Sequence, residues 1–209
     1  MLDLFFHLVF VFVFWAFTLI RAFYQRKAQR NRGKVEFREG RLYLLARLSI
    51  GIPFMLLFFA YLIRPSLLAW ANLPLPVWAR WTGVILGLTS LPLILWVQRA
   101  LDDNFSTTLH VRDEHSLVTG GPYRWVRHPM YTVLYIHWIG IALITANWVI
   151  GGVPLLALTL IVASRLKKEE ALMIEKFGDR YRWYMERTGR FFPRLSRSAI
   201  GGDWEAQGS

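Results

Sequence analysis

The sequence predicts an all-α, polytopic membrane helical bundle with about five transmembrane helices. Of its 209 residues, 55% are hydrophobic, and the mean hydropathy of the chain is +0.32. Ordinary soluble domains of this length are less apolar. Apolar runs of roughly 20 residues recur along the chain, which is the length that a helix needs to cross the hydrocarbon core of a bilayer. Lysine and arginine gather in alternate loops between these runs, as expected for a multi-pass membrane protein.

The candidate spans are five apolar runs: Leu4 to Phe23, Leu42 to Ile63, Trp78 to Val97, Pro129 to Ile150, and Pro154 to about Leu166. The first run has Asp3 in place of a basic start and lacks a small-residue cleavage site, and Arg21 follows its apolar core. These features indicate a retained anchor rather than a secretory signal. The last run is short, so we expect its helix to continue into the membrane interface.

The distribution of positive charge predicts the topology. The formal net charge is +11, and the basic residues between the first two runs are Arg26, Lys27, Arg30, Arg32, Lys34, Arg38 and Arg41. The next loop has only Arg64 and Arg80, and basic residues return before Pro129 and again from Arg165 to Arg197. This alternation predicts five crossings, with the amino end outside and the carboxyl end in the cytoplasm. Anionic lipid explains the charge more simply than nucleic acid, which we do not expect as a partner.

Several kinds of chemistry have no support in this sequence. Cysteine is absent, so there is no disulfide, no thiol nucleophile and no thiolate metal site. The histidines are scattered and form no HExxH motif, so no metal site is predicted. The sequence contains no Walker lysine loop, no GxGxxG motif after a strand and no GxSxG elbow. His137 falls in mid-membrane by count, and it is either hydrogen bonded inside the bundle or part of a ligand pathway.

The run GPYRWVRHPMY, residues 121 to 131, gathers polar side chains at the start of the fourth apolar run. Arg124, Arg127, His128 and Tyr131 lie within it, and Pro129 suits the first turn of a helix. The amide groups at the start of that helix favour an anion, and the two arginines add full positive charge. This run is therefore one half of a candidate site at a membrane surface. The preceding loop, with its turn before Pro122, is predicted to form a folded cap.

The pair Glu169 and Glu170 is the other half of the candidate site. It follows the fifth run, and a turn near residue 150 would bring Glu170 level with Tyr131 to within a turn. Adjacent glutamates cannot both face the fourth helix, so one is expected in the pocket while the other meets Arg or Lys. Each feature also has a structural explanation: a topology anchor for the arginines, an aromatic belt for Tyr131, and a solvated helix end for the glutamates. Their placement at one level of one hairpin favours a site.

These residues carry a resemblance. GPYRWVRHPMY, the Glu169-Glu170 pair and FGDRYRWYMERTGRFFPRL resemble the carboxyl-terminal half of the isoprenylcysteine carboxyl methyltransferase family, which is grouped with the phospholipid methyltransferases. The likeness covers roughly Asn104 to Pro193. It implies an S-adenosylmethionine pocket formed by Gly121, Tyr123, His128, Pro129, Tyr131, Glu169, Glu170, Tyr181 and Arg190. The segment that closes the pocket would also include Tyr184, Phe191 and Pro193.

The apolar runs predict residues 1–100 as three amino-terminal transmembrane helices, and the glycines near the carboxyl end indicate residues 195–209 as a flexible tail. The resemblance implies residues 101–194 as the catalytic region. It implies a lipophilic or prenylated acceptor at the cytosolic interface, in a prokaryotic plasma membrane. Arg124 or Arg127 would orient an acceptor carboxylate for O-methylation, and Glu169 or Glu170 would act as the base for N-methylation of a phospholipid amine. An NADPH-dependent membrane sterol-type reductase and a non-enzymatic scaffold are the alternatives from other classes.

Overall fold

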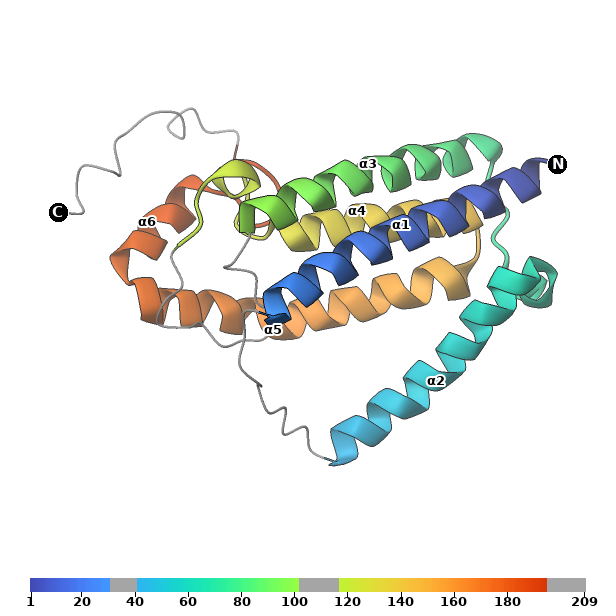
Figure 1. Ribbon diagram of the computed structural model, residues 1–209, viewed down its shortest axis with the longest axis horizontal. Coiled ribbons are helices and arrows are strands. Elements are labelled where there is room, and N and C mark those ends of the chain that lie inside the picture. The colour runs from blue at the N-terminus through green and yellow to red at the C-terminus, as the bar shows by residue number, and fades with distance from the viewer. Residues whose placement is uncertain (31–40, 102–116, 195–209) are drawn as a thin grey trace.

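A computed structural model describes residues 1–30, 41–101 and 117–194 (Figure 1). Its helices are α1 (Leu2–Arg30), α2 (Arg41–Ile63), η1 (Pro65–Ala71), α3 (Val77–Leu101), η3 (Gly121–Arg124), α4 (Pro129–Thr145), η4 (Trp148–Gly152), α5 (Val153–Phe177) and α6 (Asp179–Arg187). The described part of the chain contains no β-strand, so the predicted all-α class is confirmed. Most of the predicted cap, residues 102–116, and the predicted tail, 195–209, lie outside the described residues.

The apolar helices have the lengths expected of a polytopic membrane protein. Within the described residues, three segments are long and apolar enough to cross a bilayer: Leu2–Lys27, Val77–Leu101 and Trp148–Phe177. Two shorter apolar helices, Gly51–Ile63 and Pro129–Thr145, account for the other predicted runs. The fifth run continues as helix well beyond Leu166, to Phe177, as its shortness suggested. The direction in which the chain crosses the membrane remains a prediction.

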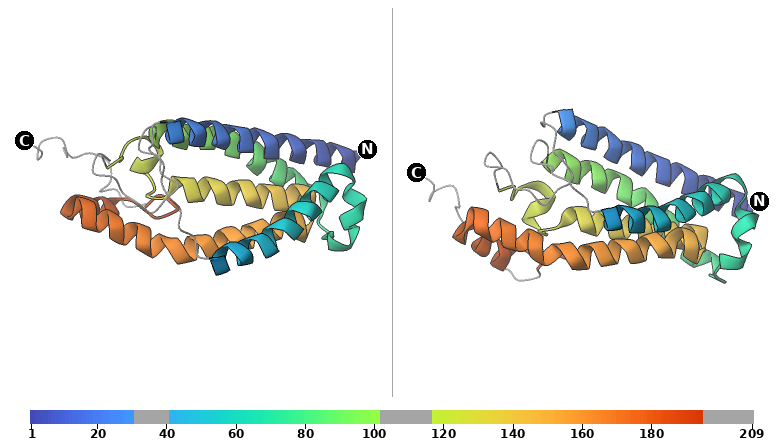
Figure 2. Two further views of the ribbon diagram at one scale, coloured as in Figure 1. Left: turned by 60° about the horizontal axis from the view of Figure 1, so that its bottom comes forward. Right: turned by 90° about the horizontal axis from the view of Figure 1, so that it is seen from below.

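Helix α4 lies at the centre of the bundle. Figure 2 shows α1 and α3 on one side of α4 and α5 on the other. Helix α2 packs on α1 through Phe58 and Tyr61, whose rings contact Phe10 at centroid distances of 6.0 and 5.5 Å. Its amino-terminal end diverges from the other helices (Figure 1). Two seams therefore meet at α4, one with α1 and α3 and one with α5.

Glycines allow α3 and α4 to approach closely. A Cβ atom placed on Gly83 would lie 2.7 Å from the backbone nitrogen of Ile144, and one on Gly140 would lie 2.8 Å from that of Gly87. Gly83 and Gly87 form the GxxxG spacing that brings membrane helices into backbone contact. Since lipid gives no hydrophobic drive for helix association, this close fit is what fixes α4 against α3.

Asn147 holds the turn between α4 and α5. Its side-chain oxygen accepts hydrogen bonds from the amides of Val149 and Ile150 at 3.1 and 3.2 Å. Its Nδ2 donates to the carbonyl of Leu68 and to Oδ1 of Asn72, both at 2.9 Å. The buried side chain of Asn147 thus gives hydrogen-bond partners to the backbone amides of the short π-helical turn and ties that turn to η1. This anchored turn fixes the register of the α4–α5 hairpin, and hence which residues meet at its far end.

Candidate active site

The chain crosses itself at the start of α4, opposite the Asn147 turn. The segment after α6 runs beside residues 126–128: the amide of Arg127 donates to the carbonyl of Gly189 at 2.7 Å, and that of His128 donates to the carbonyl of Arg190 at 3.0 Å. One turn into α4, Oγ1 of Thr132 donates to the carbonyl of Phe191 at 3.0 Å. We call residues 188–191 the closing segment. It is held against α4 mainly through backbone groups.

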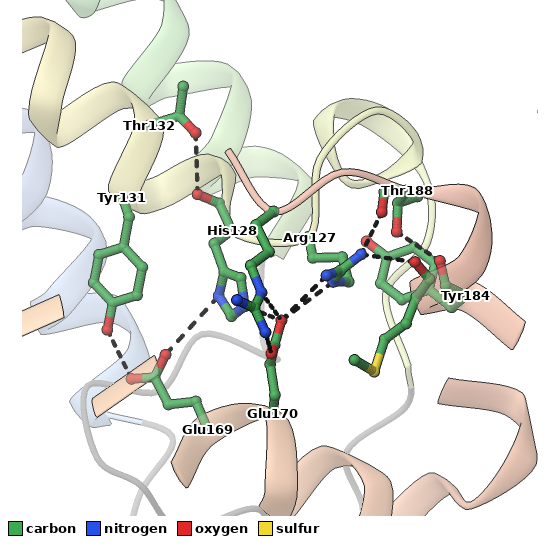
Figure 3. Close-up of polar contacts among 10 residues, drawn as sticks. Arg127, His128, Tyr131, Thr132, Glu169, Glu170, Tyr184 and Thr188 are labelled. Carbon is green, nitrogen blue, oxygen red and sulfur yellow. Dashed lines mark hydrogen bonds and ion pairs between the residues drawn. The ribbon is translucent and has the colours of Figure 1, made fainter. Parts of the chain in front are cut away.

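Glu170 is the centre of the site (Figure 3). Arg127 donates to its Oε1 from Nε and Nη2, each at 3.3 Å. Arg190 donates to Oε1 from Nε at 3.1 Å and to Oε2 from Nη2 at 2.7 Å. The side chains of Glu170 and Arg127 are 6% and 5% exposed, whereas that of Arg190 is 49% exposed. A buried carboxylate therefore joins α5 to two arginines from different parts of the chain.

Arg127 also binds the backbone around the carboxyl end of α6. Its Nη1 donates to the carbonyl of Met185 at 2.8 Å and also to the carbonyl of Thr188. Nε, Nη1 and Nη2 of its guanidinium are thus engaged by protein acceptors. Since the donors of Arg127 are committed to the fold, this side chain links α4, α5 and the closing segment rather than presenting a free cation.

Glu169 has a different environment from its neighbour. Tyr131 donates from its hydroxyl to Oε1 of Glu169 at 2.7 Å, across the hairpin (Figure 3). Arg165, one turn earlier on α5, lies 3.9 Å from the same oxygen. The side chain of Glu169 is 26% exposed, so solvent or a ligand can reach it. Of the two carboxylates, Glu169 is the accessible one.

His128 lies between the two glutamates. Its Nδ1 is 3.9 Å from Oε2 of Glu169, and its Nε2 is 3.5 Å from Oε1 of Glu170. Nε2 is buried and makes no hydrogen bond. Burial lowers the pKa of His128 below its ordinary value of 6.5, although both carboxylates act to raise it. A buried ring nitrogen without a hydrogen bond is uncommon, and this one faces the carboxylate of Glu170.

Two tyrosines of α6 pack beneath the closing segment. Tyr184 donates from its hydroxyl to the carbonyl of Tyr123 at 2.6 Å, which joins α6 to η3. Tyr181 is 2% exposed, and burial raises its pKa to about 12. Burial likewise raises the pKa of Tyr184 and of Tyr123. All three phenols are neutral near pH 7, and they act as packing groups at the base of the site.

The structure brings most of the expected residues together. Arg127, His128, Pro129, Tyr131, Glu169, Glu170, Tyr181 and Arg190 lie around the hairpin end and the closing segment. Gly121 adopts a φ of 59° and packs η3 against Trp96 and Ala100 of α3. Its role is therefore in the turn that precedes α4. The side chain of Arg124 is exposed and lies 5.0 Å from the ring centroid of Trp125. The structure records no contact between Arg124 and the carboxylates.

Sequence reasoning missed three contributors. Thr132 and the carbonyls of Met185 and Thr188 hold the closing segment in place. The carbonyls have no signature in the sequence, because every residue type carries one. Thr132 offered a weak signal, namely a hydroxyl one turn after His128 on the same helix.

Fold and site together define a class: an integral membrane helical bundle with a charged, partly open site at the end of a helical hairpin. Residues 83–175 match the isoprenylcysteine carboxyl methyltransferase (ICMT) family. The resemblance found in the sequence is thereby confirmed, and the chain is related to this family through that region.

Individual relatives agree with the family match. The cobalt-zinc-cadmium resistance protein CzcN of Cupriavidus metallidurans is 31% identical over 121 residues, which are 56% of this chain and 56% of CzcN. The protein-S-isoprenylcysteine O-methyltransferase of Mus musculus is 28% identical over 153 residues, 72% of this chain and 51% of the mouse protein. The chain spans about half the length of these curated relatives.

A solved structure shares the fold. The eukaryotic intramembrane Ras methyltransferase ICMT superposes with a TM-score of 0.55 and 22% identity, over 88% of this chain and 67% of that one. At this identity the likeness shows the fold alone. The helical bundle therefore has a counterpart among solved membrane proteins.

Proposed function

We propose that this protein is an S-adenosylmethionine-dependent methyltransferase that acts on a lipophilic acceptor at the membrane interface. The observation that carries the proposal is the hairpin end itself, where Tyr131 and Glu169 meet at 2.7 Å beside the Glu170 cluster. The family match and the methyltransferases among the relatives support it. A pocket beside the bilayer suits a water-soluble methyl donor and a membrane-dissolved acceptor.

The residues present fit this cofactor. Glu169 is a partly exposed carboxylate, which can accept hydrogen bonds from ribose hydroxyls. The rings of His128, Tyr131 and Phe191 gather beside it, with centroid distances of 5.8 Å between His128 and Tyr131 and 6.2 Å between His128 and Phe191. Aromatic faces attract a cationic group, and the sulfonium of this cofactor is one. Nε2 of His128 remains available as a further polar contact.

The chemistry asks little of the protein beyond positioning. The cofactor supplies a methyl group already activated on a positively charged sulfur. The residues of the chain align the acceptor, exclude water and stabilise the charge that spreads during transfer. The closing segment is held beside the start of α4 by Arg127 and Thr132, where it would shield the reacting groups from water.

Carboxyl O-methylation of an isoprenylcysteine-like acceptor is our leading assignment. A carboxylate acceptor needs a cation to orient it and no base. Arg127 is engaged by Glu170 and by backbone carbonyls, whereas Arg190 is half exposed and reaches Glu170 with one edge. Arg190 is therefore better placed than Arg127 or Arg124 to orient an acceptor carboxylate.

Phospholipid N-methylation is the second candidate, and Glu169 favours it. An amine acceptor must lose a proton before transfer, and Glu169 is an accessible carboxylate that could accept that proton. A nicotinamide-dependent reductase is disfavoured, because the several phosphates of a dinucleotide need several cations, whereas this site presents two carboxylates and Arg127 is fully engaged by protein acceptors. A plain scaffold has no need of the partly exposed carboxylate of Glu169 beside the rings of His128 and Tyr131.

The test has two arms. Calorimetric titration of the protein in nanodiscs should show binding of S-adenosylmethionine in the parent and weaker binding in Glu169→Gln, with Glu175→Gln as the control on an exposed face of α5. Radiolabelled S-adenosylmethionine is then incubated with a prenylcysteine analogue and, separately, with total lipid extract. Label in the analogue supports O-methylation, and label in phospholipid supports N-methylation. Absence of cofactor binding in the parent would overturn the proposal.

A further inference from the structure

The seam that α1 and α3 form with α4, on the side of α4 away from the candidate site, carries polar residues of its own. Four buried aromatic or aliphatic residues mark the face of α1 that packs there: Phe6, Phe10, Val13 and Phe17. Their spacing of three and four residues is that of one helical face, and Arg21 continues it by one turn. Arg21 is half-buried, so an arginine sits where the pattern calls for an apolar side chain.

Deeper in the same seam, polar groups are paired. His137 of α4 lies 3.1 Å from the hydroxyl of Ser90 of α3, and its ring stacks on Phe17 at a centroid distance of 3.8 Å. The hydroxyl of Ser90 in turn lies 2.6 Å from the carbonyl of Gly87. Of the two roles expected for His137, the structure therefore shows the hydrogen bond inside the bundle. This pair needs no ligand.

Arg21 and Gln98 lack such partners. Nε of Arg21 is buried and makes no hydrogen bond, and within the described residues no carboxylate forms an ion pair with its guanidinium. Gln98 of α3 is 0% exposed, and neither Nε2 nor Oε1 of its side chain has a hydrogen-bond partner. Leaving a buried amide unsatisfied costs about 1–3 kcal/mol, and an unpaired charge costs more. Such groups indicate a ligand that completes them.

The register of the two helices places these groups at a similar level along the bundle. Phe6 contacts Trp81 at a centroid distance of 5.7 Å, and Val13 lies against Gly87, so α1 and α3 run in the same direction. Continued two turns toward the end of the bundle that carries the candidate site, this register puts Arg21 level with Gln98 to within about a turn along the helix axes. The flexible stem of an arginine can span that interval. Figure 1 shows the two helices ending at the same end of the molecule.

We propose that Arg21 and Gln98 bind the phosphate of an anionic phospholipid at this end of the α1–α3 seam. Arginine matches phosphate with parallel donors, and the amide of Gln98 adds a donor from the buried side. Basic pockets between membrane helices bind acidic headgroups, and Arg21 lies between α1 and its neighbours near the helix end. Helices α1 and α3 lie across α4 from α5, which carries Glu169 and Glu170, and the inference is independent of methyl transfer (Figure 2).

The test compares lipid binding by native mass spectrometry, with phosphatidylglycerol and phosphatidylcholine added to the full chain in detergent. The parent should retain phosphatidylglycerol preferentially, and Arg21→Gln should weaken that binding about tenfold or more, as expected for loss of a charge-assisted contact. Arg26→Gln is the matched control, because Arg26 lies on the exposed face of the same helix end. Equal losses in the two variants, or no loss in Arg21→Gln, would overturn the proposal.

A second variant separates ligand binding from folding. Gln98→Leu removes an amide without a partner and keeps the volume similar, so the lipid-free protein should unfold at an unchanged or higher temperature. The same variant should bind phosphatidylglycerol more weakly than the parent. Lower stability without lipid would mean that Gln98 has a partner in the protein, and it would contradict the proposal. A third arm adds inorganic phosphate in place of lipid and compares the unfolding temperature of the parent with each ligand. An equal rise with free phosphate and with phosphatidylglycerol would show that the site binds phosphate itself rather than a lipid headgroup, and it would overturn the proposal.

Discussion

Tyr131 and Glu169 are separated by 38 positions in the sequence and joined by a hydrogen bond of 2.7 Å. The bond crosses the α4–α5 hairpin near its open end, where the apolar parts of both helices give way to polar residues. It depends on the register that Asn147 sets at the other end of the hairpin. A turn on one side of the membrane bundle thus determines which side chains form the site at the other.

Removing the hydroxyl of Tyr131 should weaken the site without unfolding the bundle. In Tyr131→Phe the ring remains and one hydrogen bond to a carboxylate is lost, which costs about 1.5–3 kcal/mol in typical cases. We expect lower affinity for S-adenosylmethionine by calorimetry, because Glu169 loses the partner that orients it. Tyr135→Phe is the control, since Tyr135 lies one turn along α4 and bonds only Thr159, at 3.3 Å. Equal affinities in the two variants would refute a role for the pair.

Glu170 should matter more for stability than Glu169 does. Glu170→Gln leaves Arg127, 5% exposed, without its carboxylate, and breaking a buried ion pair in this way costs about 3–5 kcal/mol. Thermal unfolding in detergent should show a large drop for Glu170→Gln and a small one for Glu169→Gln. Glu175→Gln, on an exposed position of α5, should have no effect. A Glu170→Gln variant as stable as Glu175→Gln would mean that Arg127 is held by the backbone carbonyls alone.

The sequence allowed the level of the hairpin contacts to be predicted, but not their pairing. Helical rise placed Glu170 opposite Tyr131 to within a turn. The observed partner of Tyr131 is Glu169, and Glu170 instead meets Arg127 and Arg190. Consecutive residues point about 100° apart on a helix, so the rotation of α5 about its axis decides the pairing. That rotation follows from packing on α4, which the periodicity of a nearly uniformly apolar run does not reveal.

The role of Arg127 was beyond sequence reasoning for another reason. A cation beside an apolar run predicts a group that reaches solvent or headgroups. In the structure Arg127 is buried instead, because the closing segment packs against it. That segment contributes the carbonyl of Thr188, which lies 61 positions later in the sequence. Contacts between a side chain and distant backbone leave no pattern of residue types. The clusters of polar residues could be identified in the sequence. Only the fold shows which of them are buried and hold the structure together, as Arg127 and Glu170 do, and which are accessible, as Glu169 is.

Acid should destabilise the site through His128. Burial lowers its pKa in the folded protein below 6.5, the value expected when unfolded, so the unfolded chain binds more protons between those two values. The contribution of His128 to stability is complete above pH 6.5 and is lost as the pH falls through the folded pKa. Unfolding temperatures measured from about pH 7.5 down to about pH 5.5 should fall in the parent and fall less in His128→Gln. Parallel profiles would show that His128 takes no proton in this range.

Packing of α3 on α4 should be intolerant of a single methyl group. In Gly140→Ala the new Cβ would lie 2.8 Å from the backbone nitrogen of Gly87 and 3.1 Å from the carbonyl oxygen of Gly83, and neither backbone atom can turn aside. Overpacking of this kind costs about 1–3 kcal/mol. We expect a lower unfolding temperature and, because α4 carries His128 and Tyr131, weaker cofactor binding as well. Gly51→Ala is the control, since a Cβ there meets nothing within 4 Å. Since alanine favours a helix more than glycine does, Gly51→Ala should be neutral or stabilising. A Gly140→Ala variant as stable as Gly51→Ala would mean that the new methyl group is accommodated and that α3 and α4 pack more loosely than their geometry indicates.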